Sequence, residues 1–343
     1  MGNSRKPRRR GIALRLFLFL VAGAITGAGL GAYELLRSLP PAGGAADVRV
    51  VPGASARSIA RSLRDAGVPL RPWEFVIAAD LTHATRALRA GRYHIEGQPT
   101  LLDLVEKFRR GDVEREQMTI VEGSTFADLR AAIAASEDLR HDTAKWTAAQ
   151  ILQAIGASEE HAEGLFAPDT YTFDPGSSDL EVFRPAYQAQ KNRLERAWQA
   201  RPAELPYKNP YEALIMASIV EKETGQSTER RQVAAVFVNR QRLGMPLQTD
   251  PTVIYGLGEE YSGRLHKRDL QTDTPYNTYT RAGLPPTPIA LPGKAAIEAA
   301  LDPQASKALY FVARGDGSSE FSNTLAEHNR AVDKYQRSAI KHE

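Results

Sequence analysis

The chain has 343 residues, of which 42% are apolar and 25% charged, a balance typical of folded proteins with two or more domains. It contains no cysteine, which excludes disulfides, thiolate metal sites and a cysteine nucleophile. The net charge of +3 comes from residues 1–37, because residues 38–343 hold 37 basic against 40 acidic side chains. The basic excess is therefore no argument for binding nucleic acid, and we expect no nucleic-acid partner.

The first predicted element is a membrane helix. A run of 18 uncharged residues, Leu16 to Tyr33, follows the basic stretch "RKPRRR". Such a run can cross the hydrocarbon core, and the positive-inside rule places the N-terminus in the cytoplasm and the rest of the chain outside. A cleaved signal peptide is the alternative, but the run is longer than the usual signal core of ~7–15 residues. We expect residues 1–37 to form a cytoplasmic tail and a retained single-pass anchor.

A linker and a small domain are predicted next. Residues 38–47 have the Pro, Gly and Ala content of a juxtamembrane linker. A pattern of short strand, Gly turn, Ser or Thr cap and helix then appears at 50–63 and again, 70 residues later, at 120–133. We expect a small α+β domain over 48–115 and a larger mixed α+β domain over 116–343. Because strand–Gly–helix units are common, coincidence is the alternative explanation of the repeat.

The larger domain is predicted to begin mainly with helices, between residues 141 and 200. Pro, Asp and Gly mark a loop at 163–178, which carries three aromatic residues. We expect these aromatic side chains to cover a core rather than line a binding groove.

Two further helices are predicted around residues 211–224 and 227–243, the second with Ser227 or Thr228 as its cap. The remainder is predicted to be loop-rich, with a helix near 294–302 and a strand at 309–314. The predicted fold class is therefore α+β.

The first of these two helices ends in an unusual group of charges. The stretch "IMASIVEKETGQ" (215–226) is almost entirely apolar or small until three charged residues arrive together. Steps of three, four and seven residues back from Glu221 meet only small and apolar residues, so its carboxyl should be desolvated and hold its proton. That is the condition for a general acid, whereas Lys222 and Glu223 are interpreted as solvated charges at the helix end. A locally capping or ion-paired Glu221 is the alternative.

Other chemistries have less support. The sequence contains no H-E-x-x-H, G-x-S-x-G or Walker motif, so we expect no metal and no organic cofactor. A glycosidase of the common kind needs a second carboxylate, and Asp250 is the best candidate, although no spacing pairs it with Glu221.

Four motifs in the same order resemble the YceG/MltG family of endolytic murein transglycosylases. They are "EGLFAPDTYTF" (163–173), "ASIVEKETG" (217–225), "NRQRLGMPLQTDPTVIYG" (239–256) and "YNTYTRAGLPPTPIALPG" (276–293). The resemblance covers nearly all of the chain outside the linker. It implies a single anchor in the bacterial inner membrane, a LysM-like domain over 48–115 and a periplasmic catalytic domain over 116–343.

The resemblance also implies the reaction. The family cleaves the bond between N-acetylmuramic acid and N-acetylglucosamine within nascent peptidoglycan strands, without water, leaves a 1,6-anhydro end and so helps to terminate glycan elongation. One glutamate of the family acts as acid and then as base, and the resemblance implies that Glu221 is the corresponding residue in this chain. The resemblance also suggests penicillin-binding synthases as partners. Gln248, Asp250, Asn277 and Tyr279 lie in the matching motifs and are expected to bind or stabilise the sugar.

Two positions depart from the family pattern. Relatives often have a histidine where this chain has Ser319, and many have a small polar residue where it has Leu291. Either departure is expected to affect glycan or peptide preference rather than the chemistry itself.

Two other functions remain open from the sequence. A hydrolytic muramidase would use Glu221 as acid, with Asp250 assisting water, and would release reducing ends. A non-catalytic peptidoglycan-binding scaffold would retain its activity after Glu221→Gln.

Overall fold

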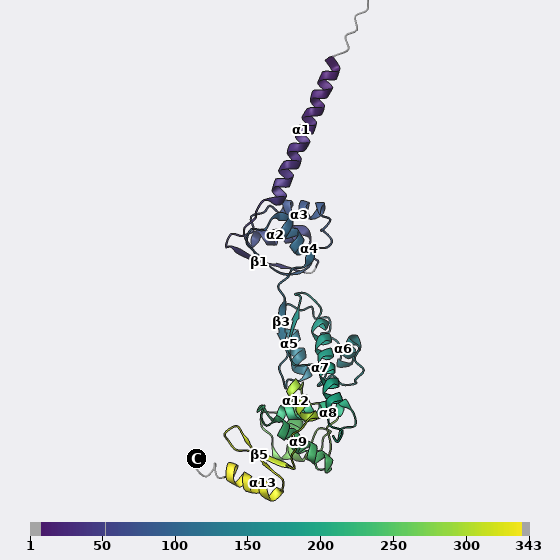
Figure 1. Ribbon diagram of the computed structural model, residues 1–343, viewed down its shortest axis with the longest axis vertical. Helices are drawn as coiled ribbons and strands as arrows, with labels where there is room; N and C mark the ends of the chain where they lie inside the picture. The colour runs from purple at the N-terminus through teal and green to yellow at the C-terminus, as the bar shows by residue number, and fades with distance from the viewer. Residues whose placement is uncertain (1–7, 52, 338–343) are drawn as a thin grey trace, which may run out of the picture. The chain divides into compact units, whose positions relative to one another are not determined.

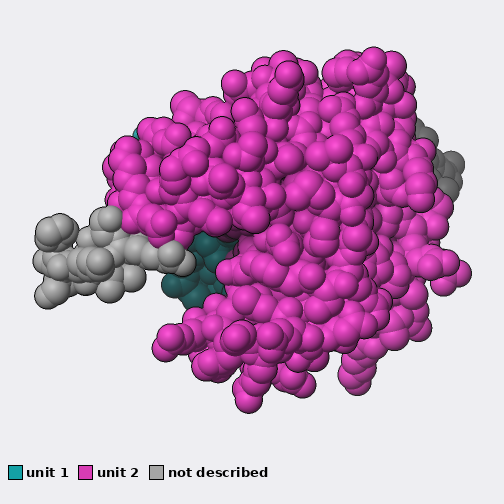
Figure 2. Space-filling model, turned by 90° about the horizontal axis from the view of Figure 1, so that it is seen from below, with its two compact units in different colours: residues 1–116, 174–177 teal, residues 117–173, 178–343 magenta. Residues whose placement is uncertain are grey.

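The computed structural model describes residues 8–51 and 53–337, as a mixed α+β chain with helices in the majority (Figure 1). It divides into two compact units, which Figure 2 colours separately. Unit 1 comprises residues 1–116 and 174–177, and unit 2 comprises residues 117–173 and 178–343.

The N-terminal helix of unit 1, α1 (Arg8–Leu36), contains the predicted apolar run. Its stretch Leu14–Leu36 has a mean hydropathy of 1.8 and is long and apolar enough to cross a membrane. The helix is compatible with a single-pass anchor and also with a signal sequence.

The rest of unit 1 combines three helices with a two-stranded sheet. In chain order its elements are β1 (Ala45–Val50), α2 (Ala56–Asp65), α3 (Pro72–Leu81), β2 (Gly91–Glu96) and α4 (Leu101–Arg110). The strands pair antiparallel, with Val48 opposite Tyr93. Tyr93 and Phe108 pack with ring centroids 4.2 Å apart in the core of this unit.

The predicted linker at 38–47 is wrong over much of its length. Leu39 is 1% exposed and lies in the core of unit 1, and β1 already begins at Ala45. The Pro and Gly residues hid the alternation of β1, in which Ala46 and Val48 point inward while their neighbours are exposed.

Unit 2 begins with strand and helix elements around one core. They are β3 (Glu116–Thr119), α5 (Phe126–Ala135), α6 (Ala148–Ile155), β4 (Thr170–Phe173) and α7 (Leu180–Ala200), and β3 pairs with β4. Thr125 caps α5, as the repeated pattern predicted, and Ser55 caps α2 in the same way.

The predicted loop at 163–178 therefore contains a strand, β4, which the dense turn residues around it concealed. Its aromatic residues Phe166 and Phe173 are buried in the core of unit 2, as expected.

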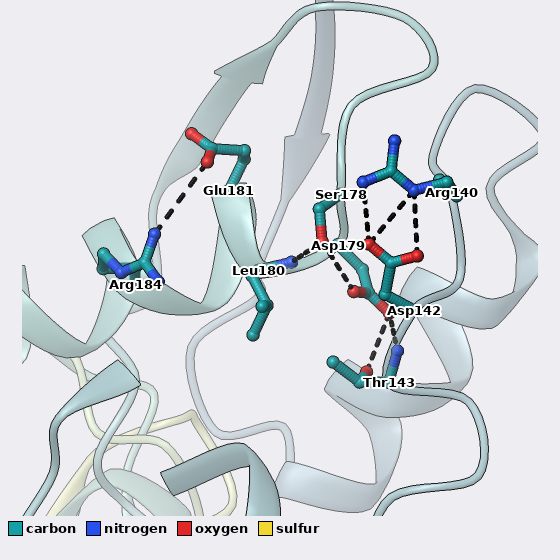
Figure 3. A network of polar contacts seen from close by, with 8 residues as sticks. All are labelled: Arg140, Asp142, Thr143, Ser178, Asp179, Leu180, Glu181 and Arg184. Atoms are coloured by element: carbon teal, nitrogen blue, oxygen red, sulfur yellow. Dashed lines mark hydrogen bonds and ion pairs between the residues drawn. The ribbon is translucent and has the colours of Figure 1, made fainter. Parts of the chain in front are cut away.

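A polar network secures the start of α7 (Figure 3). The Asp179 carboxylate, 1% exposed, accepts hydrogen bonds from the Thr143 backbone N–H at 3.0 Å and from its Oγ1 at 2.7 Å. Arg140 and Asp142 form an ion pair beside it at 2.8 Å. A buried carboxylate is stable there because its oxygens are hydrogen-bonded.

The remaining elements complete unit 2. They are α8 (Pro210–Glu223), α9 (Arg230–Arg242), α10 (Asp250–Leu257), the 3-10 turn η1 (Gly258–Glu260), α11 (Lys267–Gln271), α12 (Lys294–Leu301), β5 (Tyr310–Ala313), β6 (Ser319–Ser322), α13 (Leu325–Val332) and the π-turn η2 (Asp333–Arg337). The predicted helices at 211–224 and 294–302 and the strand at 309–314 are confirmed within one residue at each end. β5 pairs antiparallel with β6.

Two local predictions in this part are wrong. The stretch after Gln248 was expected to be a loop but forms α10, where Pro251 occupies the first turn and its fixed φ suits a helix start. Helix α9 begins at Arg230 with Glu229 in the cap position, so Ser227 and Thr228 lie before the helix.

Candidate active site

Helix α8 lies at the centre of unit 2, packed against α7, α9, α10 and α12. Asn209 caps it by accepting a hydrogen bond from the Glu212 N–H, and Pro210 starts the first turn. Eight consecutive residues, 213–220, are buried, which confirms that the helix is enclosed on all sides. Glu221 and Glu223 follow directly on this buried stretch, so their carboxyl groups lie at the edge of the core.

The carboxylate of Glu221 contacts neighbouring parts of unit 2 at the end of α8. Its Oε2 accepts a hydrogen bond from the Gly293 backbone N–H at 2.8 Å, and its Oε1 lies 3.9 Å from Nη2 of Arg230. The side chain is 7% exposed. Burial raises its pKa, the bond to Gly293 opposes that shift, and the negative charge of Glu122 reinforces it.

Glu223 occupies a different environment. It lines a cavity of about 310 Å³, in which the hydroxyl of Thr249 donates a hydrogen bond of 2.6 Å to its Oε2. Burial raises its pKa, the Thr249 bond opposes the shift, and the negative charge of Asp250 adds to it. The interpretation of Glu223 as a solvated charge is wrong, because α8 turns this side chain toward α10 and the cavity.

The cavity gathers side chains from six parts of unit 2. Besides Glu223 from α8, it is lined by residues of α9, of the segment before α10, of the 275–283 loop, of β5 and of α13: Val236, Phe237, Arg240, Leu247, Gln248, Tyr279, Tyr310, Phe311, Leu325 and His328. Polar, aromatic and apolar groups thus surround one protonatable carboxyl, which is a typical composition for a binding site.

Arg240 organises one wall of this cavity. It is 7% exposed, and its guanidinium donates to the backbone carbonyls of Leu309 at 2.7 Å and Leu247 at 3.0 Å. It also donates to Oε1 of Gln248 at 3.2 Å. Gln248 has a φ of +54°, a conformation that L-residues seldom adopt and that marks a constrained position.

His328 completes the same wall. Its ring stacks on Tyr310 with centroids 5.2 Å apart, and burial together with the Arg240 charge lowers its pKa, which favours the neutral imidazole.

The structure brings three of the predicted binding residues together. Gln248 and Tyr279 both line the cavity, and the Tyr279 hydroxyl donates a hydrogen bond of 2.6 Å to Oδ1 of Asp250. Asp250 is exposed, so its second carboxylate oxygen is available to a ligand.

Asn277 is placed differently. It is fully buried, and its Nδ2 donates to the carbonyls of Asp269, Leu270 and Thr272 while its Oδ1 accepts the Tyr279 N–H at 2.9 Å. This side chain holds the loop that carries Tyr279, and its part in sugar binding stays a prediction.

Sequence reasoning missed Glu223, although a signal was present. Steps of three, four and seven residues back from Glu223 meet Val220, Ile219 and Met216, a more apolar stripe than the one behind Glu221. It also missed Arg240 and His328, which the sequence does not distinguish from ordinary helix residues.

The two departures from the family pattern lie outside the cavity lining. Leu291 is fully buried, and its backbone pairs with Gly123 and Ser124. The backbone N–H of Ser319 donates to Oε1 of Glu229 at 2.9 Å.

Comparisons with known proteins identify relatives of this chain. A model of the YceG-like family matches residues 48–334. A Bacillus subtilis protein named endolytic murein transglycosylase is 32% identical over 271 residues, which make up 72% of this chain and 73% of that protein. A protein of the same name from Streptococcus pneumoniae is 26% identical over 328 residues, or 85% of this chain and 59% of that protein.

A crystal structure of a yceG-like protein from Listeria monocytogenes is 30% identical in sequence, with a TM-score of 0.53. The match covers 84% of this chain and 99% of that structure.

Proposed function

This chain belongs to the YceG-like family, and we propose that it cleaves peptidoglycan glycan strands with Glu223 as the acid and base. It is a lytic transglycosylase, in keeping with relatives named endolytic murein transglycosylase. The observation that carries the assignment of Glu223 is its place in the cavity beside Gln248 and Tyr279.

The reaction requires one group that first gives and then takes a proton. Protonated Glu223 donates its proton to the oxygen that bridges N-acetylmuramic acid to N-acetylglucosamine, and the bond from C1 to that oxygen breaks. The resulting carboxylate removes the proton from the C6 hydroxyl of the same muramic acid. That oxygen then bonds to C1, which gives a 1,6-anhydro end, restores protonated Glu223 and consumes no water.

The surroundings of Glu223 suit both half-reactions. Its raised pKa keeps the proton available, and the Thr249 hydroxyl steadies the carboxylate after the proton has left. The Asp250 carboxylate, oriented by Tyr279, supplies negative charge for the oxocarbenium-like transition state. Gln248 and Tyr279 orient the sugar at the cavity wall.

Glu221 remains the alternative that the resemblance suggested. Its carboxylate is occupied by the Gly293 N–H and Arg230, so in our proposal it positions the end of α8.

The products of the full-length protein in detergent test this proposal. Purified uncrosslinked strands are incubated with the wild type, Glu223→Gln and Glu221→Gln, and the fragments are weighed. We expect anhydro-ended fragments from the wild type and from Glu221→Gln, and none from Glu223→Gln.

Other outcomes separate the competing functions. Fragments one water heavier per cut identify a hydrolytic muramidase. If Glu221→Gln loses cleavage and Glu223→Gln keeps it, the general acid is Glu221. No cleavage by the folded wild type supports a peptidoglycan-binding scaffold.

We also propose that α1 is a retained single-pass anchor with the N-terminus in the cytoplasm and residues 38–343 outside. The basic residues before Leu16 and the length of the apolar stretch support this. Carbonate-washed membranes should retain the intact chain, and protease added to spheroplasts should digest unit 2. A soluble chain shortened at its N-terminus would instead identify a signal peptide.

Residues 48–115 are proposed to form a LysM-like domain that binds glycan, and residues 116–343 the catalytic domain. Strand–turn–helix modules in unit 1 support the first assignment, and the cavity in unit 2 supports the second. Deletion of 48–115 should weaken sedimentation with purified strands, and unchanged sedimentation would refute glycan binding there.

Penicillin-binding synthases are the proposed protein partners, because the anchor would hold unit 2 where new strands emerge. Crosslinking in membranes should recover a synthase, and recovery of none would contradict this partnership.

A further inference from the structure

Unit 2 contains a second hollow, of about 720 Å³, which the proposed reaction does not use. It lies between the second half of α7, helix α12 and the first turn of α9. Five basic side chains line it, together with two acidic ones, and we call it the basic groove. The basic residues are Arg193, Arg196, Arg201, Arg231 and Lys294.

The positive charge of this groove is only partly neutralised. Asp302 is bound by Arg231 at 2.7 Å, and Glu298 lies 3.6 Å from Lys294. These are the two acidic residues of the lining, so three basic side chains remain in excess. The excess is notable because residues 38–343 together carry more acidic than basic side chains.

The three excess cations differ in their availability. Arg193 is paired with Asp169 at 2.7 Å, and Arg201 stacks its guanidinium 3.4 Å above the ring of Trp198. Arg196 is exposed and has no ion-pair or hydrogen-bond partner within the described part of the chain. Arg196 is therefore the group best placed to bind an anion.

The groove also has apolar walls. Ala197 and Ala200 from α7 and Ile297 and Leu301 from α12 belong to its lining. A ligand that fits must combine carboxylates with small apolar side chains, and a volume of this size is typical of ligand sites. Guanidinium groups bind carboxylates as bidentate pairs.

We propose that the basic groove binds the carboxylate-bearing peptides that the glycan strand carries on its muramic acid residues. This inference rests on the proposed function, since it concerns the same substrate. Such peptides combine free carboxylates with methyl side chains, which matches the two kinds of lining.

The groove and the cavity are both lined by residues of α9. Helix α9 contributes Arg231 to the groove and Val236 and Arg240 to the cavity. At a rise of about 1.5 Å per residue, the groove residue lies roughly 8–14 Å along the helix axis from the cavity residues. The same intervals place Arg231 roughly 140° and 180° around the helix from Val236 and Arg240, so the groove and the cavity open on opposite sides of α9. The peptide bound in the groove is therefore carried by a different muramic acid of the strand from the one at Glu223.

The test compares two substrates on the full-length protein in detergent. One is uncrosslinked strands that carry their peptides, and the other is the same strands after an amidase has removed the peptides. The variant is the double substitution Arg196→Glu and Lys294→Glu. The control is Arg184→Glu, the reversal of one charge on α7 outside the groove. Circular dichroism verifies that each variant is folded.

We expect the double variant to lose about tenfold in kcat/KM on peptide-bearing strands and to match the wild type on stripped strands. The control should match the wild type on both substrates. Equal rates for the double variant and the wild type on peptide-bearing strands would overturn the proposal. So would equal losses on both substrates, because the groove would then act on the glycan itself.

A binding measurement separates failure of this inference from failure of the proposed function. Titration of the free peptide into the wild type and the double variant requires no cleavage. Weaker binding by the variant supports the groove even if no strand is cut, and equal binding refutes it. If only crosslinking to a membrane protein is lost in the variant, the groove serves a protein partner and the peptide proposal is wrong.

Discussion

Two carboxyl groups, two residues apart at the end of α8, have opposite surroundings. Glu221 faces the backbone of Gly293 and the guanidinium of Arg230, whereas Glu223 faces a cavity of about 310 Å³. Two residues turn a helix by roughly 200°, so neighbouring charges of one motif point to opposite sides. The pKa of both is raised by burial, and the pKa direction therefore does not identify the catalytic group. Our proposal that Glu223 is the catalytic group rests instead on its access to the cavity.

The sharpest test of this contrast is the pair of isosteric variants. Removing a general acid and base reduces the rate about 10²–10⁴-fold, so Glu223→Gln should lower kcat by at least a hundredfold. Glu221→Gln keeps an oxygen that can accept the Gly293 N–H, and its kcat should stay within about tenfold of the wild type. Initial rates on uncrosslinked strands measure both, and the reverse order would break the comparison.

Glu163 is a third buried carboxyl, and it is not among the residues that line the cavity. It tests whether a raised pKa away from the cavity affects stability alone. Glu163 accepts hydrogen bonds from the Phe126 N–H and the Tyr255 hydroxyl, and burial raises its pKa from 4.5 to about 7. Because the folded state holds this proton more tightly, the associated stability is full below about pH 4.5 and is lost as the pH rises through 7.

We therefore expect Glu163→Gln to match the wild type at pH 4 and to exceed its free energy of unfolding at pH 8 by at most about 3 kcal/mol. Urea unfolding across this pH range measures the difference. A constant difference between the two proteins at every pH would contradict the assigned pKa.

Asn277 separates support of the cavity from contact with the ligand. Asn277→Ala leaves three partly buried carbonyls without their donor and should lower the free energy of unfolding by about 2 kcal/mol. Gln248→Ala, at an exposed wall position, should weaken strand binding with little effect on unfolding. If Asn277→Ala were as stable as the wild type but bound strands more weakly, the prediction that Asn277 contacts the sugar would be supported.

The smallest expected effect on the cavity side of α8 comes from Tyr279. Tyr279→Phe removes the hydrogen bond of 2.6 Å to Asp250 and should lower kcat/KM about tenfold, the effect of one hydrogen bond to a charged group. Tyr171→Phe is the matched control, because its hydroxyl donates to the Ala167 carbonyl and Tyr171 is not among the cavity residues. Equal losses in both variants would indicate a general effect on packing.

Much of the fold could be predicted because its signals are local. The apolar run of α1, the caps at Ser55 and Thr125, and the limits of α8 and α12 depend on residues within a few positions of each other. The family could be predicted for a similar reason, since its motifs are short and contiguous.

The errors arose where turn residues accompany regular structure. Proline starts α10 and glycine precedes β1, yet both stretches were interpreted as loops. Glu223 was dismissed because a charge at a helix end is usually solvated, and only packing reveals what lies beside it.

The sequence by itself thus determined an α+β chain of the YceG-like family, with an apolar N-terminal helix and an acidic group at the end of a buried helix. The tertiary structure decided which of two glutamates meets the cavity, and it assembled the basic groove from residues of α7, α9 and α12. The physical reason is that the cavity is built from residues 223 to 328, far apart in the chain, and helix geometry turns only one of the two carboxyls toward them.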